Sequence, residues 1–214
     1  MDVLFRNWDL FSRGFLTTLQ LLLVSGVLSV ALGTFLAALR VSPVPALRRA
    51  GAGYVTLLRN TPLTLVFFLV VFGFPALAIE ISFFARAVVA LTVYTAAFVC
   101  EAVRAGINTV SVGQAEAARA LGMGFGQTLR LVVLPQAVRS VLPPLASVVI
   151  ALAKNTTVAA GFSVLEAGAI RAYLSERGES VVAGLLWVAF GFLLVVIPLS
   201  LAQRRLEARW AVTR

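Results

Sequence analysis

The sequence predicts an all-α polytopic membrane protein with five transmembrane helices, and two observations support this prediction. Of its 214 residues 60% are hydrophobic and the mean hydropathy is +0.98, well above soluble globular domains. The apolar residues also gather into runs of the roughly 20 residues that a helix needs to cross a bilayer. The predicted spans are residues 15–39, 63–79, 85–103, 141–161 and 181–201. No linker or repeat divides the chain, so 1–214 is expected to form one membrane domain.

The charged residues are distributed unevenly between the predicted connections. The chain carries 18 Lys and Arg against 9 Asp and Glu, a net charge of +9. In a soluble protein this excess would suggest nucleic acid, but in a membrane protein it sets orientation. Five arginines lie outside the spans on one side and twelve on the other. We therefore expect no nucleic-acid partner, an N-terminus outside and a cytoplasmic C-terminus in the cell membrane.

The first two predicted spans each carry a local signal. In the first, Ser25, Ser29 and Gly33 follow at four-residue steps, and such a stripe of small residues lets another helix approach closely. Pro62 precedes the second and suits the first turn of a helix. If this span instead begins near residue 51, Arg59 lies deeper in the membrane, and the sequence allows both positions.

The third and fourth predicted spans contain charged residues, which are expensive in a bilayer and indicate function or pairing. Glu101 shares a helical face with Tyr94 and Phe98, and it could accept an amino group or pair with Arg104 three residues on. Lys154 lies 13 residues after the start of its span, about 20 Å into a core of about 30 Å. It could meet a carboxylate of an acidic amino acid, or pair with a buried group or a partner chain.

About 37 residues, 104–140, separate the third and fourth spans and are expected to build a cytoplasmic structure. Ser111 and Gln114 have the spacing of a capping box at the start of an Ala-rich helix. Gly122 suits the left-handed residue that stops such a helix. A second short helix is predicted over 125–134, ended by Pro135.

This segment has no nucleotide-binding loop, because its glycines lack the GxGxxG spacing and the chain has no GxxxxGK[ST]. An amphipathic hairpin resting on lipid headgroups is one alternative for it. A membrane enzyme is not expected, since the chain has no His, one Cys at position 100, and only Glu101 as a carboxylate within a span. No metal site and no cofactor are predicted.

The same segment resembles the EAA loop of ABC importer permeases. Glu116-Ala117-Ala118 is followed after three residues by Gly122, and after nine more by a VVLP run that starts at Val132, where the family pattern has Ile. The resemblance covers most of the chain, because RNTPL, GQAEAARALG, LPQAVR and KNTT resemble segments of polar-amino-acid permeases, most of all glutamate-type subunits. These segments are residues 59–63, 113–122, 134–139 and 154–157.

The resemblance implies the type I importer fold and a set of partners. The loop would dock on a cytoplasmic ABC ATPase dimer, which binds the ATP, beside a second permease subunit of the same or another kind and an extracytoplasmic amino-acid-binding protein. Residues expected to couple to the ATPase are Glu116, Ala117, Ala118, Gly122, Leu134 and Pro135. Residues expected along the substrate pathway are Arg59, Asn60, Thr61, Tyr94, Glu101, Lys154, Asn155, Thr156 and Thr157. Arg59 could equally be an anchor at the cytoplasmic interface.

The expected function is translocation of a polar amino acid, with glutamate as the first choice. Glutamine, aspartate or a basic amino acid are alternatives within the same importer class. A stand-alone channel or secondary carrier is a further alternative, for which an internal inverted repeat would be expected.

Overall fold

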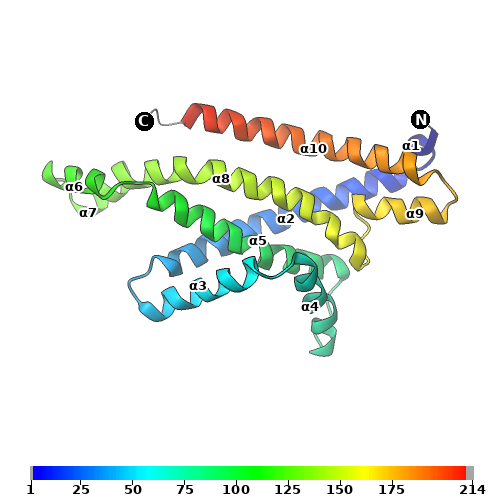
Figure 1. The fold of residues 1–214 in the computed structure, drawn as a ribbon, viewed down its shortest axis with the longest axis horizontal. Coiled ribbons are helices and arrows are strands. Elements are labelled where there is room, and N and C mark those ends of the chain that lie inside the picture. The colour runs from blue at the N-terminus through cyan, green and yellow to red at the C-terminus, as the bar shows by residue number, and fades with distance from the viewer. Residues whose placement is uncertain (1, 211–214) are drawn as a thin grey trace.

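The computed structural model describes residues 2–210, and this part of the chain is helical without a β-strand. Helices α2, α5, α8 and α10 extend along the long axis of the molecule, and α6 and α7 project at one end (Figure 1). The α-helices are α1 (Asp2–Arg6), α2 (Trp8–Arg40), α3 (Pro45–Arg59), α4 (Leu63–Ala76), α5 (Phe83–Asn108), α6 (Val112–Ala120), α7 (Phe125–Gln127), α8 (Leu134–Asn155), α9 (Ile170–Glu176) and α10 (Val181–Trp210). A π-helical turn (Thr128–Val133) precedes α8, and 3₁₀ turns (Thr156–Phe162 and Ala167–Ala169) follow it.

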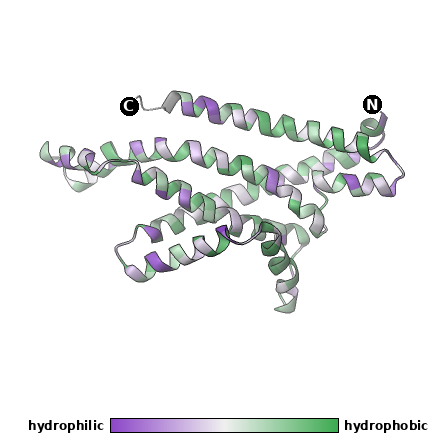
Figure 2. Cartoon of the chain, viewed as in Figure 1, coloured by the Kyte–Doolittle hydropathy of each residue, from purple (hydrophilic) through white to green (hydrophobic). Residues whose placement is uncertain are grey.

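Four continuous helical segments of the described residues are long and apolar enough to cross a membrane: Trp8–Arg40, Phe83–Asn108, Phe125–Phe162 and Val181–Ala208. They confirm the first, third, fourth and fifth predicted spans, each extended at one or both ends. Figure 2 shows apolar residues along most of α10, with hydrophilic residues near its C-terminal end. The bundle is therefore built for an apolar environment along most of its length.

The second span differs from the straight helix predicted over 63–79. It is a bent pair, α3 and α4, whose axes turn by 102° at the break between them. Pro62 has no amide hydrogen and an extended backbone (ψ 138°), so the helix cannot continue through it. With 14 residues α4 measures about 21 Å, too short to cross a core of about 30 Å alone. Arg59 is the last residue of α3 and lies at the break.

The small-residue stripe on α2 is confirmed as a packing surface against α5. Ser25, Ser29 and Gly33 are all buried. A Cβ on Gly33 would lie 2.8 Å from the backbone oxygen of Ala96, so only glycine permits this approach. The Ser29 hydroxyl donates to the Thr92 carbonyl oxygen at 3.4 Å. Close backbone approach is a means by which helices associate in lipid, where apolar burial between helices gains little.

Arg86 fixes the end of α4 against α5. Pro75 lies inside α4 and lacks the amide hydrogen that would bond the Val71 carbonyl four residues earlier. The Arg86 guanidinium donates to that oxygen at 3.2 Å and lies 5.0 Å from the Phe83 ring centroid. A side chain of α5 thus satisfies a backbone group that proline leaves open in α4.

Candidate functional site

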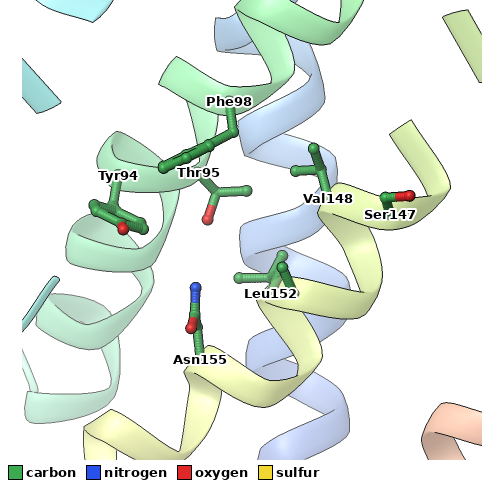
Figure 3. A pocket seen from close by; sticks show the side chains of 8 residues that line it. Tyr94, Thr95, Phe98, Ser147, Val148, Leu152 and Asn155 are labelled. Atoms are coloured by element: carbon green, nitrogen blue, oxygen red, sulfur yellow. The ribbon is translucent and has the colours of Figure 1, made fainter. Parts of the chain in front are cut away.

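A cavity of about 260 Å³ lies between α5 and α8 (Figure 3). This is slightly below the roughly 300–1,000 Å³ of drug-sized pockets, so it suits a small ligand. Its position is set by α5, which packs against α2 on another side, and by α8, which continues from the projecting α6 and α7. The lining residues are Tyr94, Thr95, Phe98, Ser147, Val148, Ala151, Leu152 and Asn155.

A few polar groups face this mostly apolar cavity. Thr95 and Asn155 approach each other across the space between α5 and α8 in Figure 3. The Thr95 hydroxyl is buried and has no hydrogen-bond partner among the described residues. An unpaired buried hydroxyl costs roughly 1–3 kcal/mol, so a ligand that bonds it would recover that free energy. Ser147 is already engaged, because Nε2 of Gln203 on α10 donates to its hydroxyl at 2.8 Å.

Two aromatic rings of α5 line the cavity, and a guanidinium of α3 lies near one of them. The rings of Tyr94 and Phe98 are 5.0 Å apart between centroids, which confirms that these two residues share a face. The Arg59 guanidinium carbon lies 5.7 Å from the Phe98 centroid, within the range of a cation–π contact. A cation from the α3–α4 break is therefore placed beside the cavity.

Glu101 lies one turn beyond Phe98, in a cluster of charges outside the lining set. Arg40 contacts one carboxylate oxygen, and Arg104 donates to the other at 2.9 Å, which confirms the local pair that the sequence offered as one possibility. Arg59 is 3.9 Å from the same carboxylate. Three guanidiniums and one carboxylate give the cluster a formal charge of +2.

Residues 154–157 (KNTT), at the end of α8 and the start of the following 3₁₀ turn, face different sides. Asn155 lines the cavity with Tyr94, whereas Lys154 and Thr157 line a separate groove of about 380 Å³ against α10. Thr156 is buried and its hydroxyl donates to the Ala153 carbonyl at 2.9 Å. The expected pathway residues thus do not form one surface.

Asn60 and Thr61 also lie outside the cavity lining. Their side chains donate back to the carbonyl oxygens of Thr56 and Leu57, at 2.7 and 2.8 Å. They therefore close the last turn of α3. Among the described residues, no group of three or more His, Cys, Asp or Glu side chains is arranged to hold a metal.

The projecting segment around α6 ends as the sequence predicts. Gly122 has φ +81°, the left-handed conformation that suits glycine. Its amide donates to the Arg119 carbonyl at 2.9 Å, and the amide of Met123 donates to the Ala118 carbonyl at 3.1 Å. These two bonds are those of a Schellman motif, so the stop at Gly122 is confirmed.

Two other predictions for this segment are wrong. Ser111 precedes α6, but its side chain makes no capping hydrogen bond; the side chain of Gln127 instead accepts from the Gly124 amide at 3.0 Å, at the next helix start. Pro135 does not end a second helix; it is the second residue of α8, and the helical segment continues through it from the π-helical turn. The π-helical turn joins α7 to α8, so the α6–α7 segment continues into the helix that lines the cavity.

The surface of the α6–α7 segment is unusually apolar for a projecting element. Val112, Leu121 and Phe125 are 73%, 83% and 76% exposed. Glu116 and Ala117 are exposed beside them, while Ala118 is buried. Exposed apolar residues gathered on one projection are typical of a surface that binds another protein.

Sequence reasoning missed Thr95, Arg40 and Glu166. Thr95 is a polar residue within an apolar span next to Tyr94, a signal that could have found it. Glu166, in the connection before α10, is fully buried, and the Thr18 hydroxyl donates to it at 3.2 Å. Burial raises the pKa of the Glu166 carboxyl and outweighs the hydrogen bonds that lower it. Only the fold reveals that this connection is enclosed.

Comparison with known proteins gives consistent relatives over nearly the whole chain. The family model described as "Binding-protein-dependent transport system inner membrane component" matches residues 29–212. The "Glutamate transport system permease protein GluC" of Corynebacterium efficiens is 40% identical, over 94% of this chain and 93% of that protein. The "Probable glutamine ABC transporter permease protein GlnM" of Bacillus subtilis is 37% identical, over 98% and 97%. The solved structure "Crystal structure of an amino acid ABC transporter with histidines" superposes with a TM-score of 0.90 and 26% identity, over 97% of both chains.

Proposed function

Because this chain belongs to the family of binding-protein-dependent transport system inner membrane components, and is a permease of an ABC amino-acid importer, we propose that its substrate is glutamate. It is a membrane-embedded transport subunit and not itself an enzyme. The similarity to a glutamate permease at 40% identity supports glutamate, and the similarity to a glutamine permease at 37% keeps glutamine as the second candidate.

The cavity between α5 and α8 is proposed as the substrate site. The observation that carries this proposal is the buried, unpaired Thr95 hydroxyl opposite Asn155, in a space of amino-acid size. A hydroxyl and an amide can bond the polar groups of an amino acid, and the Arg59 guanidinium carbon lies 5.7 Å from the centroid of Phe98. Such a small number of placed polar groups in an apolar site is typical of ligand pockets.

We further propose that the α6–α7 segment docks on a cytoplasmic ABC ATPase dimer, which binds and hydrolyses the ATP. Glu116 would be its polar contact, beside the exposed apolar residues, and Gly122 sets its bend. Leu134 and Pro135 begin α8 directly after the π-helical turn. A displacement of the segment would therefore move the helix that carries Asn155, which is how ATPase closure would reorient the cavity.

A second permease subunit is proposed to cover the groove between α8 and α10. Lys154 is exposed there beside Leu193, which lies 12 residues after Val181 and 10 before Gln203. These separations are about 18 and 15 Å of helix, which supports a position of the ammonium near mid-membrane. A charge inside a membrane needs a polar or oppositely charged group nearby, which a partner chain or a substrate carboxylate would supply. Thr157 would share that role.

The unequal distribution of arginines supports a cytoplasmic α6 end, an N-terminus outside and a cytoplasmic C-terminus. An extracytoplasmic amino-acid-binding protein would then deliver substrate at the α1 end of the molecule. Cysteines placed at residues 80 and 113 and labelled by a membrane-impermeant thiol reagent in intact cells test this orientation. Labelling at 80 and not at 113 is expected, and the reverse pattern would contradict it.

Uptake measurements test the substrate and its site. In cells that carry the complete transporter, excess unlabelled glutamate should abolish uptake of radiolabelled glutamate, and glutamine should compete more weakly. Thr95→Val should reduce uptake, because it removes the cavity hydroxyl and preserves the shape. Thr92→Val is the matched control, since the Thr92 hydroxyl is equally buried and unpaired on α5 but does not line the cavity. Full competition by glutamine without competition by glutamate would refute glutamate, and equal effects of the two variants would refute the site.

A further inference from the structure

Arg59 stands in an unusual place for an arginine. It is the last residue of α3, at the break of the bent pair, and its guanidinium lies over Phe98 of the cavity wall. Two residues of α5, Glu101 and Phe98, lie within reach of its guanidinium.

Glu101 is one neighbour, but it holds Arg59 weakly. Arg40 and Arg104 already bind both oxygens of this carboxylate, and their side chains are 19% and 34% exposed. Arg59 is the farthest of the three, at 3.9 Å, and its side chain is 47% exposed. Removing Arg59 from the cluster would leave Glu101 paired with two guanidiniums. Arg59 is thus the cation of this cluster that is free to bind another anion at little cost.

Phe98 is the other neighbour, and it brings the guanidinium close to the cavity wall. The guanidinium carbon lies 5.7 Å from the centroid of this ring, and the ring lines the cavity. Stacking on an aromatic face leaves the edge of a guanidinium, with its forked donors, available for a carboxylate. Lys154, which the sequence suggested for this role, lines the opposite groove against α10. Of the cations in residues 2–208, Arg59 is the one in contact with a ring of the cavity wall.

We propose that Arg59 binds the α-carboxylate of the transported amino acid, exchanging its long contact with Glu101 for a bidentate pair with the substrate. This proposal rests on the cavity being the substrate site, as proposed above. It does not depend on which amino acid is carried, because every amino acid has the same α-carboxylate. The residual positive charge of the cluster favours this exchange, since the anion enters a region of formal charge +2.

Direct binding of ligands to the purified permease–ATPase complex, without the binding protein, tests the proposal. The two probes are L-glutamate and its α-carboxamide, which differ only at the group that Arg59 is proposed to bind. The variants are Arg59→Gln and Arg59→Lys. Arg104→Gln is the matched control, because Arg104 also pairs with Glu101 but makes no cation–π contact with Phe98. Arg59→Gln should weaken glutamate binding about 10- to 100-fold, the range of a charge-assisted hydrogen bond, and leave the α-carboxamide within about twofold.

The other variants separate this role from a structural one. Arg59→Lys should recover part of the glutamate affinity, because it keeps the charge and loses the fork. Arg104→Gln should keep the wild-type ratio between the two ligands. Equal losses for both ligands in Arg59→Gln, or an unchanged ratio, would overturn the proposal. If the wild-type complex binds no glutamate, the proposed substrate is wrong; the amino acid identified by uptake and its own α-carboxamide then test Arg59 in the same way.

Discussion

Replacing Gly122 by alanine tests whether the bend after α6 positions the segment that is proposed to dock on the ATPase. Gly122 and Gly113 both lie in the projecting segment, and an added Cβ on either would meet no atom within 4 Å. They differ in backbone conformation: Gly122 has φ +81°, whereas Gly113 lies within α6. The alanine at 122 is therefore strained by its backbone alone, by about 1–2 kcal/mol. At 113 it should stabilise the helix by up to about 1 kcal/mol.

Hydrogen exchange of the Met123 amide reports this difference locally. That amide donates to Ala118 across the bend, and a cost of 1–2 kcal/mol corresponds to roughly 5- to 30-fold faster exchange through local opening. Gly122→Ala should also lower the ATPase activity that transport stimulates, whereas Gly113→Ala should slow exchange and preserve activity. Unchanged protection of the Met123 amide in Gly122→Ala would show that alanine at position 122 does not strain the bend, whatever happened to activity.

The remaining predictions concern packing and pH. Gly33→Ala should lower the thermal stability of the purified transporter, because overpacking against the Ala96 carbonyl at about 1–3 kcal/mol outweighs a propensity gain of up to about 1 kcal/mol. Gly26→Ala in the same helix is the control, because its Cβ would make only an ordinary contact at 3.7 Å and should not destabilise the transporter. Equal melting temperatures of the two variants would contradict this view of the α2–α5 contact. Burial raises the pKa of Glu166, so the folded state holds that proton more tightly than the unfolded chain, whose glutamate pKa is about 4.3. The resulting stabilisation is complete below that value and is lost as pH rises through the raised folded pKa. Glu166→Gln keeps an acceptor for Thr18 and should remove this fall in melting temperature with rising pH. If the melting temperature of the variant depends on pH as that of the wild type does, Glu166 is not the source of the fall.

Much of the architecture followed from local signals in the sequence. Hydrophobic length predicted the four continuous spans, since a helix of about 20 apolar residues can satisfy its backbone in lipid by itself. The small residues of α2 predicted a close helix contact, and Gly33 provides it. Gly122 predicted the stop of α6 because a left-handed residue is a property of one position. Ser111 and Pro135 were interpreted wrongly, because a capping residue or a proline permits a helix start at several neighbouring positions.

The site was predictable only in part. Tyr94 and Phe98 were placed together correctly because one helix fixes their spacing, and the pairing of Glu101 with Arg104 was predicted as one possibility for the same reason. Asn155 was named with three neighbours, of which Lys154 and Thr157 proved to line another surface. Consecutive residues on a helix point about 100° apart, so a polar run cannot be assigned to one side before the neighbouring helices are known.

Composition, run length and short motifs in the sequence were enough to predict the membrane class, four continuous spans and the permease family. Only the tertiary structure shows that the second predicted span is a bent helix pair, that Arg40 and Arg59 lie near Glu101, and that the cavity lies between α5 and α8. It also decided that Glu166 is buried against Thr18, although its connection looks exposed in the sequence. The reason is the same in each case: these features join side chains far apart in the chain, and their spacing is set by how helices pack and not by the spacing of residues along any one of them.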